Sequence, residues 1–144
     1  METIAKTERD AEQTTFSPKS PSPKSPSDMI DAPRYWNPGN ALARVEGDET
    51  LLRELIQLFL EDYPRTLQDL RTAIAEGDVR SLERHAHTIK GSAANFEAAP
   101  VVTAGLELET SGFRKDLTYV APQMENLEAA LAQLRGELEA FLTR

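Results

Sequence analysis

The residues best suited to chemistry in this sequence lie in one segment, LERHAHTIKGSAANFEA, residues 82–98. If the segment is a helix that turns by about 100° per residue, its large apolar side chains share one face. These side chains are Leu82, Ile89, Ala93 and Phe96. His87 then points about 150° away from the centre of that face, into solvent. A neutral imidazole is a good nucleophile near pH 7, because its reference pKa is about 6.5.

The neighbours of His87 on the helix surface favour close approach by a charged group. Lys90 and Gly91 follow one turn later and Ala94 two turns later. Glycine in mid-helix costs up to ~1 kcal/mol relative to alanine, and that cost is acceptable where another molecule must come close. The Lys90 cation can offset charge on phosphoryl oxygens. The segment therefore predicts that His87 accepts a phosphoryl group from another protein, with Lys90, Gly91 and Ala94 at the docking surface.

Other residues in and near this segment have simpler interpretations. His85 lies about 50° from the centre of the apolar face, so we predict a packing role for it. A metal site shared by His85 and His87 is not expected, because side chains two positions apart on a helix point ~200° apart. The same argument applies to Glu107 and Glu109, and we interpret most of the acidic residues as solvated charge. Ser92 has no plausible arrangement of base and acid for hydrolase chemistry, and GSAANF lacks the glycine spacing of a phosphate-binding loop.

The elements that must position the segment are all predicted to be helices, because apolar residues recur with helical spacing and no alternation of period two occurs. Capping residues and breakers give the bounds. The predicted helices run from Asn37-Pro38 to about Val45, from Asp48 to Gly77, from Val79 to Ala98, from Pro100 to Gly112, and from Ala121 to Leu142. Pro64 is expected to kink or break the second helix. Short connections predict an all-α fold, an antiparallel four-helix bundle with a short extra N-terminal helix.

The apolar stripes of these helices predict the core. In the long second helix the stripe is Leu51, Leu52, Leu55, Leu58, Phe59, Tyr63, Leu67, Leu70 and Ile74. In the fourth helix it passes through Val101, Leu106 and Leu108, and in the last through Met124, Leu127, Leu131, Leu134, Leu138 and Phe141.

Residues 1–33 differ in composition from the rest of the 144-residue chain. They are rich in Ser, Pro, Thr and Lys, and they include the run SPKSPSPKSPS. Such a segment buries too little apolar surface to offset its ordering entropy. We therefore predict a disordered tail or linker at 1–33 and one folded domain at 34–144.

Composition excludes several classes of protein. The net charge of −8 and pI near 4.8 disfavour a nucleic-acid binder. No apolar run approaches the ~20 residues that span a bilayer, and no signal peptide is evident. The absence of cysteine excludes disulfides and thiolate sites. We expect a cytoplasmic, monomeric protein that binds no metal or cofactor of its own.

The segment Ala86 to Ala98, AHTIKGSAANFEA, resembles the signature of histidine phosphotransfer (HPt) domains, approximately A-H-x-L-K-G-S-x-x-x-x-G-A. ALARVEGDETLLRELIQLF, residues 41–59, also resembles the N-terminal helices of that family. The resemblance implies that His87 is phosphorylated, with Lys90 and Gly91 at the matching lysine and glycine positions. Glu97 departs from the pattern, which has glycine there. We expect it to prolong the helix and to add negative charge near the docking surface.

The resemblance also implies partners and a reaction. The chain would accept a phosphoryl group from the aspartate of a response-regulator receiver domain and pass it to another receiver, which supplies Mg²⁺. It would then have no kinase activity of its own. Two alternatives remain open. The chain is the C-terminal portion of a hybrid sensor histidine kinase, or it is a helical adaptor that only docks partners.

Overall fold

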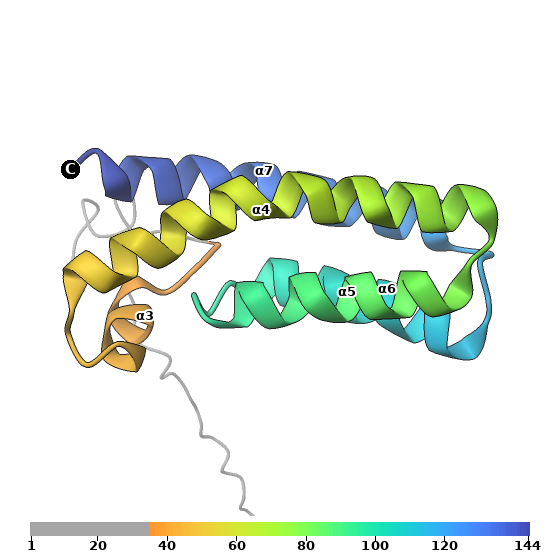
Figure 1. The fold of residues 1–144 in the computed structure, drawn as a ribbon, viewed down its shortest axis with the longest axis horizontal. Coiled ribbons are helices and arrows are strands. Elements are labelled where there is room, and N and C mark those ends of the chain that lie inside the picture. The colour runs from red at the N-terminus through yellow and green to blue at the C-terminus, as the bar shows by residue number, and fades with distance from the viewer. Residues whose placement is uncertain (1–34) are drawn as a thin grey trace, which may run out of the picture. The chain divides into compact units, whose positions relative to one another are not determined.

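The structure, a computed structural model, describes residues 35–144. Within that range it contains five helices and no strand (Figure 1). The helices are α3 (Pro38–Arg44), α4 (Glu49–Glu76), α5 (Val79–Ala94), α6 (Ala99–Arg114) and α7 (Val120–Leu142). The predicted tail lies outside the described residues, so the boundary between tail and domain stays a prediction.

Helices α4 to α7 form the predicted antiparallel four-helix bundle. Helix α4 packs against α5 and α7, and α6 packs against the same two helices. Figure 1 shows α4 beside α7 and α5 beside α6, with the chain reversing direction at each connection. The short α3 packs against α4 at one end of the bundle. This arrangement confirms the predicted fold class.

Short polar side chains begin the helices as expected. Asn37, Asp48 and Asp78 each accept a hydrogen bond from the backbone N–H three residues later, at 2.9, 3.0 and 3.1 Å. Gly77 ends α4 in the left-handed conformation, with φ of 68°. Helix α4 continues without interruption through Pro64, so this proline does not break the helix.

Two helix ends differ from the prediction. Helix α5 ends at Ala94 and not at Ala98. Glu97 follows it with φ of 55°, in the left-handed region, so the expectation that this residue prolongs the helix is wrong. Helix α6 continues past Gly112 to Arg114, and Gly112 is a buried residue inside it.

The turn between α5 and α6 is held to α3 by Glu97. Arg44 donates a hydrogen bond of 2.7 Å to the Glu97 carboxylate, and the side-chain amide of Asn40 donates one of 3.5 Å. The backbone N–H of Asn37 donates to the Phe96 carbonyl at 3.0 Å. These bonds offset the cost of ~1–2 kcal/mol for a left-handed backbone at a non-glycine residue. The charge of Glu97 is paired with that of Arg44, and the expectation that it lies near the docking surface stays a prediction. We call Glu97, Asn40 and Arg44 the clamp.

Aromatic side chains pack at the same end of the bundle and join its parts. The Trp36 ring lies 6.3 Å from Phe96 and 5.3 Å from Phe141, between ring centroids. Phe59 of α4 lies 5.4 Å from Phe96. All four rings are buried. The cluster therefore connects the segment before α3, the turn after α5, and helices α4 and α7.

The rest of the core follows the predicted stripes, with three exceptions. The stripe residues that are exposed are Leu51, Leu58 and Leu106. Helical spacing places a residue near an apolar face, but the neighbouring helices decide which edge of that face they cover.

Two glycines allow α6 to lie unusually close to α5. A Cβ atom added at Gly112 would lie 2.7 Å from the backbone nitrogen of Glu83 and 2.9 Å from the carbonyl oxygen of Val79. One added at Gly105 would lie 3.2 Å from Cβ of Lys90. Residues seven apart share a face of a helix, so both glycines face α5. Their missing side chains set the position of every α6 residue between them.

Candidate functional site

Helix α5 presents His87 as the sequence predicted. Leu82, Ile89, Ala93 and the following Phe96 are buried, together with Ala86. The His87 side chain is 67% exposed. The other histidine, His85, is mostly buried and its Nδ1 lies 4.0 Å from the Asp69 carboxylate of α4. The predicted rotation of α5 is therefore confirmed, and the position of His85 agrees with a packing role.

A carboxylate from α6 completes the site. Oε2 of Glu109 lies 2.8 Å from Nδ1 of His87, and Oε1 lies 2.5 Å from Nζ of Lys90. The Glu109 side chain is only 19% exposed. The hydrogen bond from Lys90 holds the pKa of Glu109 below its ordinary value of 4.5, assisted by the hydrogen bond with His87 and opposed by burial. Glu109 is thus an anion that shares its two oxygens between the histidine and the lysine.

The interpretation of Glu109 as ordinary solvated charge is wrong. The divergence of Glu107 and Glu109, two positions apart, concerns α6 alone. The contact with His87 joins two helices, so the pattern of one helix could not reveal it. A signal was present nonetheless. Gly105 and Gly112 stand on either side of Glu109, and glycines at this spacing inside a helix favour a close neighbour on their face.

The other predicted site residues occupy different surroundings. Lys90 is largely covered and engages Glu109. Gly91 is exposed. Apart from its chain neighbours and the backbone of its own helix turns, no described atom lies within 4 Å of the position that a Cβ atom would take. Ala94 is half-buried at the last position of α5. The structure thus brings His87 and Lys90 together through Glu109, leaves the space at Gly91 open, and places Ala94 at the end of α5.

The surface beside His87 contains basic residues that the sequence analysis did not select. A shallow pocket of about 430 Å³ is lined by Arg80, Glu83, Arg84, His87, Thr88 and Glu109. Arg84 and Arg80 precede His87 by three and seven residues, so helical spacing places them on the same side of α5. That spacing was the available signal. The open surface at His87 thus has arginines towards the start of α5 and Gly91 towards its end.

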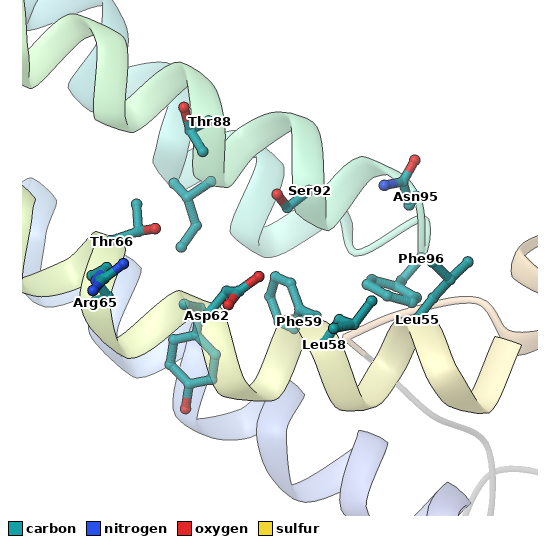
Figure 2. A pocket seen from close by; sticks show the side chains of 12 residues that line it. Leu55, Leu58, Phe59, Asp62, Arg65, Thr66, Thr88, Ser92, Asn95 and Phe96 are labelled. Atoms are coloured by element: carbon teal, nitrogen blue, oxygen red, sulfur yellow. The ribbon is translucent and has the colours of Figure 1, made fainter. Parts of the chain in front are cut away.

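A second groove, of about 420 Å³, lies between α4 and α5. Figure 2 shows its apolar residues Leu55, Leu58, Phe59 and Phe96 along one stretch and Thr88 and Ser92 on the side of α5. Thr88 lines both this groove and the pocket at His87. The two hollows therefore form a continuous surface across α5, and Leu58, which is 54% exposed, stands on it.

Residues 35–144 hold no group of three or more His, Asp or Glu side chains that could bind a metal ion. The prediction that the chain binds no metal or cofactor of its own stays untested. None of the described helices is both long and apolar enough to cross a membrane.

Comparison with known proteins agrees with this geometry. Residues 54–142 match the Hpt domain family. Histidine-containing phosphotransfer protein B (HptB) from Pseudomonas aeruginosa PAO1 has a similar structure, with a TM-score of 0.72 and 26% identity over 78% of this chain and 97% of that one. The HPT domain of a sensor hybrid histidine kinase from Shewanella has a similar fold, with a TM-score of 0.64 and 19% identity over 76% and 94%. No curated protein matches the chain.

Proposed function

Because the chain belongs to the Hpt domain family, and so has a role in histidine phosphotransfer, we propose that His87 is the residue that carries the phosphoryl group. In this proposal His87 receives the group from the aspartate of one receiver domain and passes it to the aspartate of another. The donor's O–P bond breaks as an N–P bond forms on the imidazole. The second step reverses this exchange on the next receiver. The family resemblance implies that each receiver supplies the Mg²⁺.

The observation that carries the proposal is the exposed His87 imidazole beside the open position at Gly91. An imidazole that must enter another protein's cleft has to stand clear of its own surface. His87 is 67% exposed, and Gly91 leaves space one turn further along α5. His85 has neither property, since it is mostly covered and faces α4. We therefore assign the phosphoryl group to His87 alone.

The continuous surface across α5 supports docking of a receiver over His87. On α4, exposed Leu58 borders the groove that reaches Thr88. On α6, Leu106 is exposed and Phe113 is 71% exposed. These two residues lie about one turn before and one turn after Glu109 on the same side of the helix. Large exposed apolar side chains gathered around a polar centre are typical of protein interfaces, so we place the receiver contact on α4, α5 and α6.

The direct test starts from a receiver domain labelled with radioactive phosphate from acetyl phosphate. It is mixed with the parent chain or with His87→Gln, and the acid-labile label is mapped. We expect label on His87 in the parent and none on the folded variant. Full labelling of His87→Gln would overturn the assignment. Binding of receivers without any transfer to the parent chain would favour the docking-only adaptor.

A second incubation addresses kinase activity. The chain with ATP and Mg²⁺, but without a receiver or a kinase, is expected to stay unlabelled. Self-labelling from ATP would contradict the role of a carrier. The possibility that the chain is the HPt portion of a hybrid kinase changes neither expectation, because the ATP-binding part would lie elsewhere in that protein.

A further inference from the structure

We propose that Arg80, Arg84 and Phe113 form a selectivity surface beside His87, which fits a receiver domain whose phosphorylation site is bordered by carboxylates and an apolar side chain. We call these three residues the basic edge. The proposal rests on the proposed function of His87 and adds which receivers the chain recognises. The basic edge selects the partner and takes no part in the transfer of the phosphoryl group itself.

The two arginines are available to a partner. Arg80 and Arg84 are both exposed, and both line the pocket of about 430 Å³ that also contains His87. The Arg84 guanidinium donates a hydrogen bond of 3.4 Å to the hydroxyl of Ser81, which is a neutral group. Within residues 35–144 neither arginine forms an ion pair with a carboxylate, whereas four other arginines do so at 2.7 to 3.0 Å.

The charge of this pocket is opposite in sign to that of the whole chain, which is −8. The carboxylate of Glu109 is paired with Lys90. The other charged residues that line the pocket are Arg80, Arg84 and Glu83, two positive charges and one negative. Screening in ~0.15 M salt limits charge interactions to about 8 Å. The charges next to the contact therefore decide whether an acidic partner is attracted, although the chain as a whole would repel it.

Phe113 supplies the apolar part of the basic edge. Its side chain is 71% exposed, the largest exposed fraction among the large hydrophobic residues of the described chain. It lies one helical turn after Glu109 and directly follows Gly112, where α6 comes close to the backbone of α5 between residues 79 and 83. Phe113 therefore lies beside the turn of α5 that carries Arg80. Exposed aromatic residues next to arginines are typical anchors of protein interfaces.

These side chains define the chemistry of the partner. Guanidinium groups bind carboxylates through paired hydrogen bonds, and an exposed ring binds an apolar side chain that covers it. The receiver aspartate must come within bonding distance of the His87 imidazole, so the border of its site faces the pocket and the basic edge. A receiver with carboxylates at that border is attracted. One with lysines or arginines there is repelled, and the chain discriminates between the two.

The experiment measures docking and chemistry separately. It compares the parent with Arg80→Gln/Arg84→Gln and with Phe113→Ser, and thermal melts report the fold. The probe is a receiver domain that accepts phosphate from the parent. Titration calorimetry at several salt concentrations gives its Kd, and a transfer assay gives kcat and KM. Phosphoramidate, a small donor that loses ammonia as it phosphorylates histidine, loads His87 without any docking.

Two control variants lie elsewhere in the bundle. Arg71→Gln/Arg135→Gln also removes two positive charges, but from α4 and α7, where these arginines pair with Glu128 and Glu139. Leu51→Ser removes an exposed apolar side chain from the first turn of α4, at the α3 end of the bundle. Both controls should bind the receiver and transfer phosphate as the parent does.

The charged and apolar parts should differ in their dependence on salt. Arg80→Gln/Arg84→Gln should weaken receiver binding at least ~10-fold in ~0.01 M salt, and the loss should shrink at higher salt because exposed charges are screened. Phe113→Ser should weaken binding at every salt concentration, because apolar burial involves no charge. In both variants KM should rise, while kcat and loading by phosphoramidate stay at the parental values.

An exchange of charges tests the partner's side of the contact. Arg84→Glu should bind the receiver more weakly than Arg84→Gln. A receiver in which one carboxylate at the border, outside the Mg²⁺ site, is replaced by arginine should restore binding to Arg84→Glu and lose binding to the parent. Failure of every such exchange would overturn the assignment of carboxylates to the partner.

The remaining outcomes separate this inference from the proposed function. Parental binding at low salt by either folded variant would overturn the basic edge and leave His87 as the carrier. Loading that falls as much as transfer would show that the arginines act on the phosphoryl group, and an equal loss in Arg71→Gln/Arg135→Gln would show a general effect of charge. Either result would overturn the selectivity role. If no receiver labels the parent on His87, the proposed function itself fails.

Discussion

Glu97 and Glu109 form similar ion pairs, but their carboxylates contact different parts of the molecule. Each has its pKa lowered chiefly by a hydrogen bond from a basic side chain, Arg44 for Glu97 and Lys90 for Glu109. Glu97 connects a turn to α3. Glu109 connects α6 to α5 but also touches the exposed imidazole of His87. The ion pair alone therefore does not distinguish the two carboxylates, whereas the contact with His87, the proposed phosphoryl carrier, does.

The surroundings of the two glutamates differ in the same way. Next to Glu97 in the chain is Phe96, whose ring packs in the buried aromatic cluster. Around Glu109 lie an open pocket and exposed apolar side chains. We call His87, Lys90, Gly91 and Glu109 the transfer face. Substitutions near the clamp should lower the stability of the fold and leave the rate of phosphoryl transfer nearly unchanged. Substitutions on the transfer face should slow transfer and leave the stability nearly unchanged.

The largest effect is expected from Phe96→Ala. The ring is buried and contacts both Trp36 and Phe59, so its removal should cost about 3–5 kcal/mol in the free energy of unfolding. Urea denaturation followed by circular dichroism measures this loss. Phe96 also lines the groove beside Thr88, so the transfer rate of the folded variant from a labelled receiver should fall, but less than that of Gly91→Gln. A folded variant as slow as Gly91→Gln would show that the two regions are coupled.

Gly112→Ala should lower both the stability of the fold and the rate of transfer. The added Cβ would meet backbone atoms of α5 at 2.7 and 2.9 Å, and such overpacking costs about 1–3 kcal/mol. Any shift of α6 also displaces Glu109, so transfer should slow in the folded variant. Gly136→Ala is the matched control, because nothing lies within 4 Å of its Cβ position in α7. That control should be slightly stabilising, by up to ~1 kcal/mol. Equal melts for the two variants would contradict the close packing.

Gly91→Gln tests the transfer face alone. The Cβ position is open in the free protein, so the fold should tolerate the side chain and the thermal melt should stay close to that of the parent. The glutamine would meet a receiver docked over His87, and transfer should slow by at least ~10-fold, or ~1.4 kcal/mol in the barrier. Parental transfer in a stable variant would show that receivers do not approach over Gly91.

Glu97→Gln should produce a small effect on stability that depends on pH. Because the pKa of Glu97 is lowered from 4.5 in the folded chain, the ionised carboxylate stabilises the fold above that ordinary value. This stabilisation is lost as pH falls through the lowered pKa. The melting temperature of the parent should therefore exceed that of the variant at pH 7, and the gap should close as the pH falls through the lowered pKa of Glu97. Transfer at pH 7 should be unchanged. A gap that persists at low pH would mean that the carboxylate charge is not the cause.

Deletion of residues 1–33 should have the smallest effect, since their composition cannot support a packed core. The shortened chain should keep both its melting temperature and its rate of transfer. A loss of more than ~10-fold in rate, with an unchanged melt, would show that the tail takes part in docking.

The sequence by itself determined the helices and the orientation of His87. Asp48, Gly77 and Asp78 mark helix ends through bonds to backbone groups within a few residues. The position of His87 opposite Ile89 and its apolar neighbours follows from the repeat of a single helix. These features need no knowledge of the other helices, because every interaction that causes them is local.

Only the tertiary structure decided which residues meet His87 and what Glu97 does. Glu109 and His87 are 22 positions apart in the sequence, and their contact depends on how closely α6 approaches α5 and how it is rotated. Glu97 has a left-handed backbone, and its carboxylate binds Arg44 and Asn40, which are more than 50 positions away. The sequence pattern placed Gly112 at a helix end, whereas it lies inside α6, in close contact with the backbone of Glu83. Such contacts arise between helices, and the period of one helix carries no information on its distance from another.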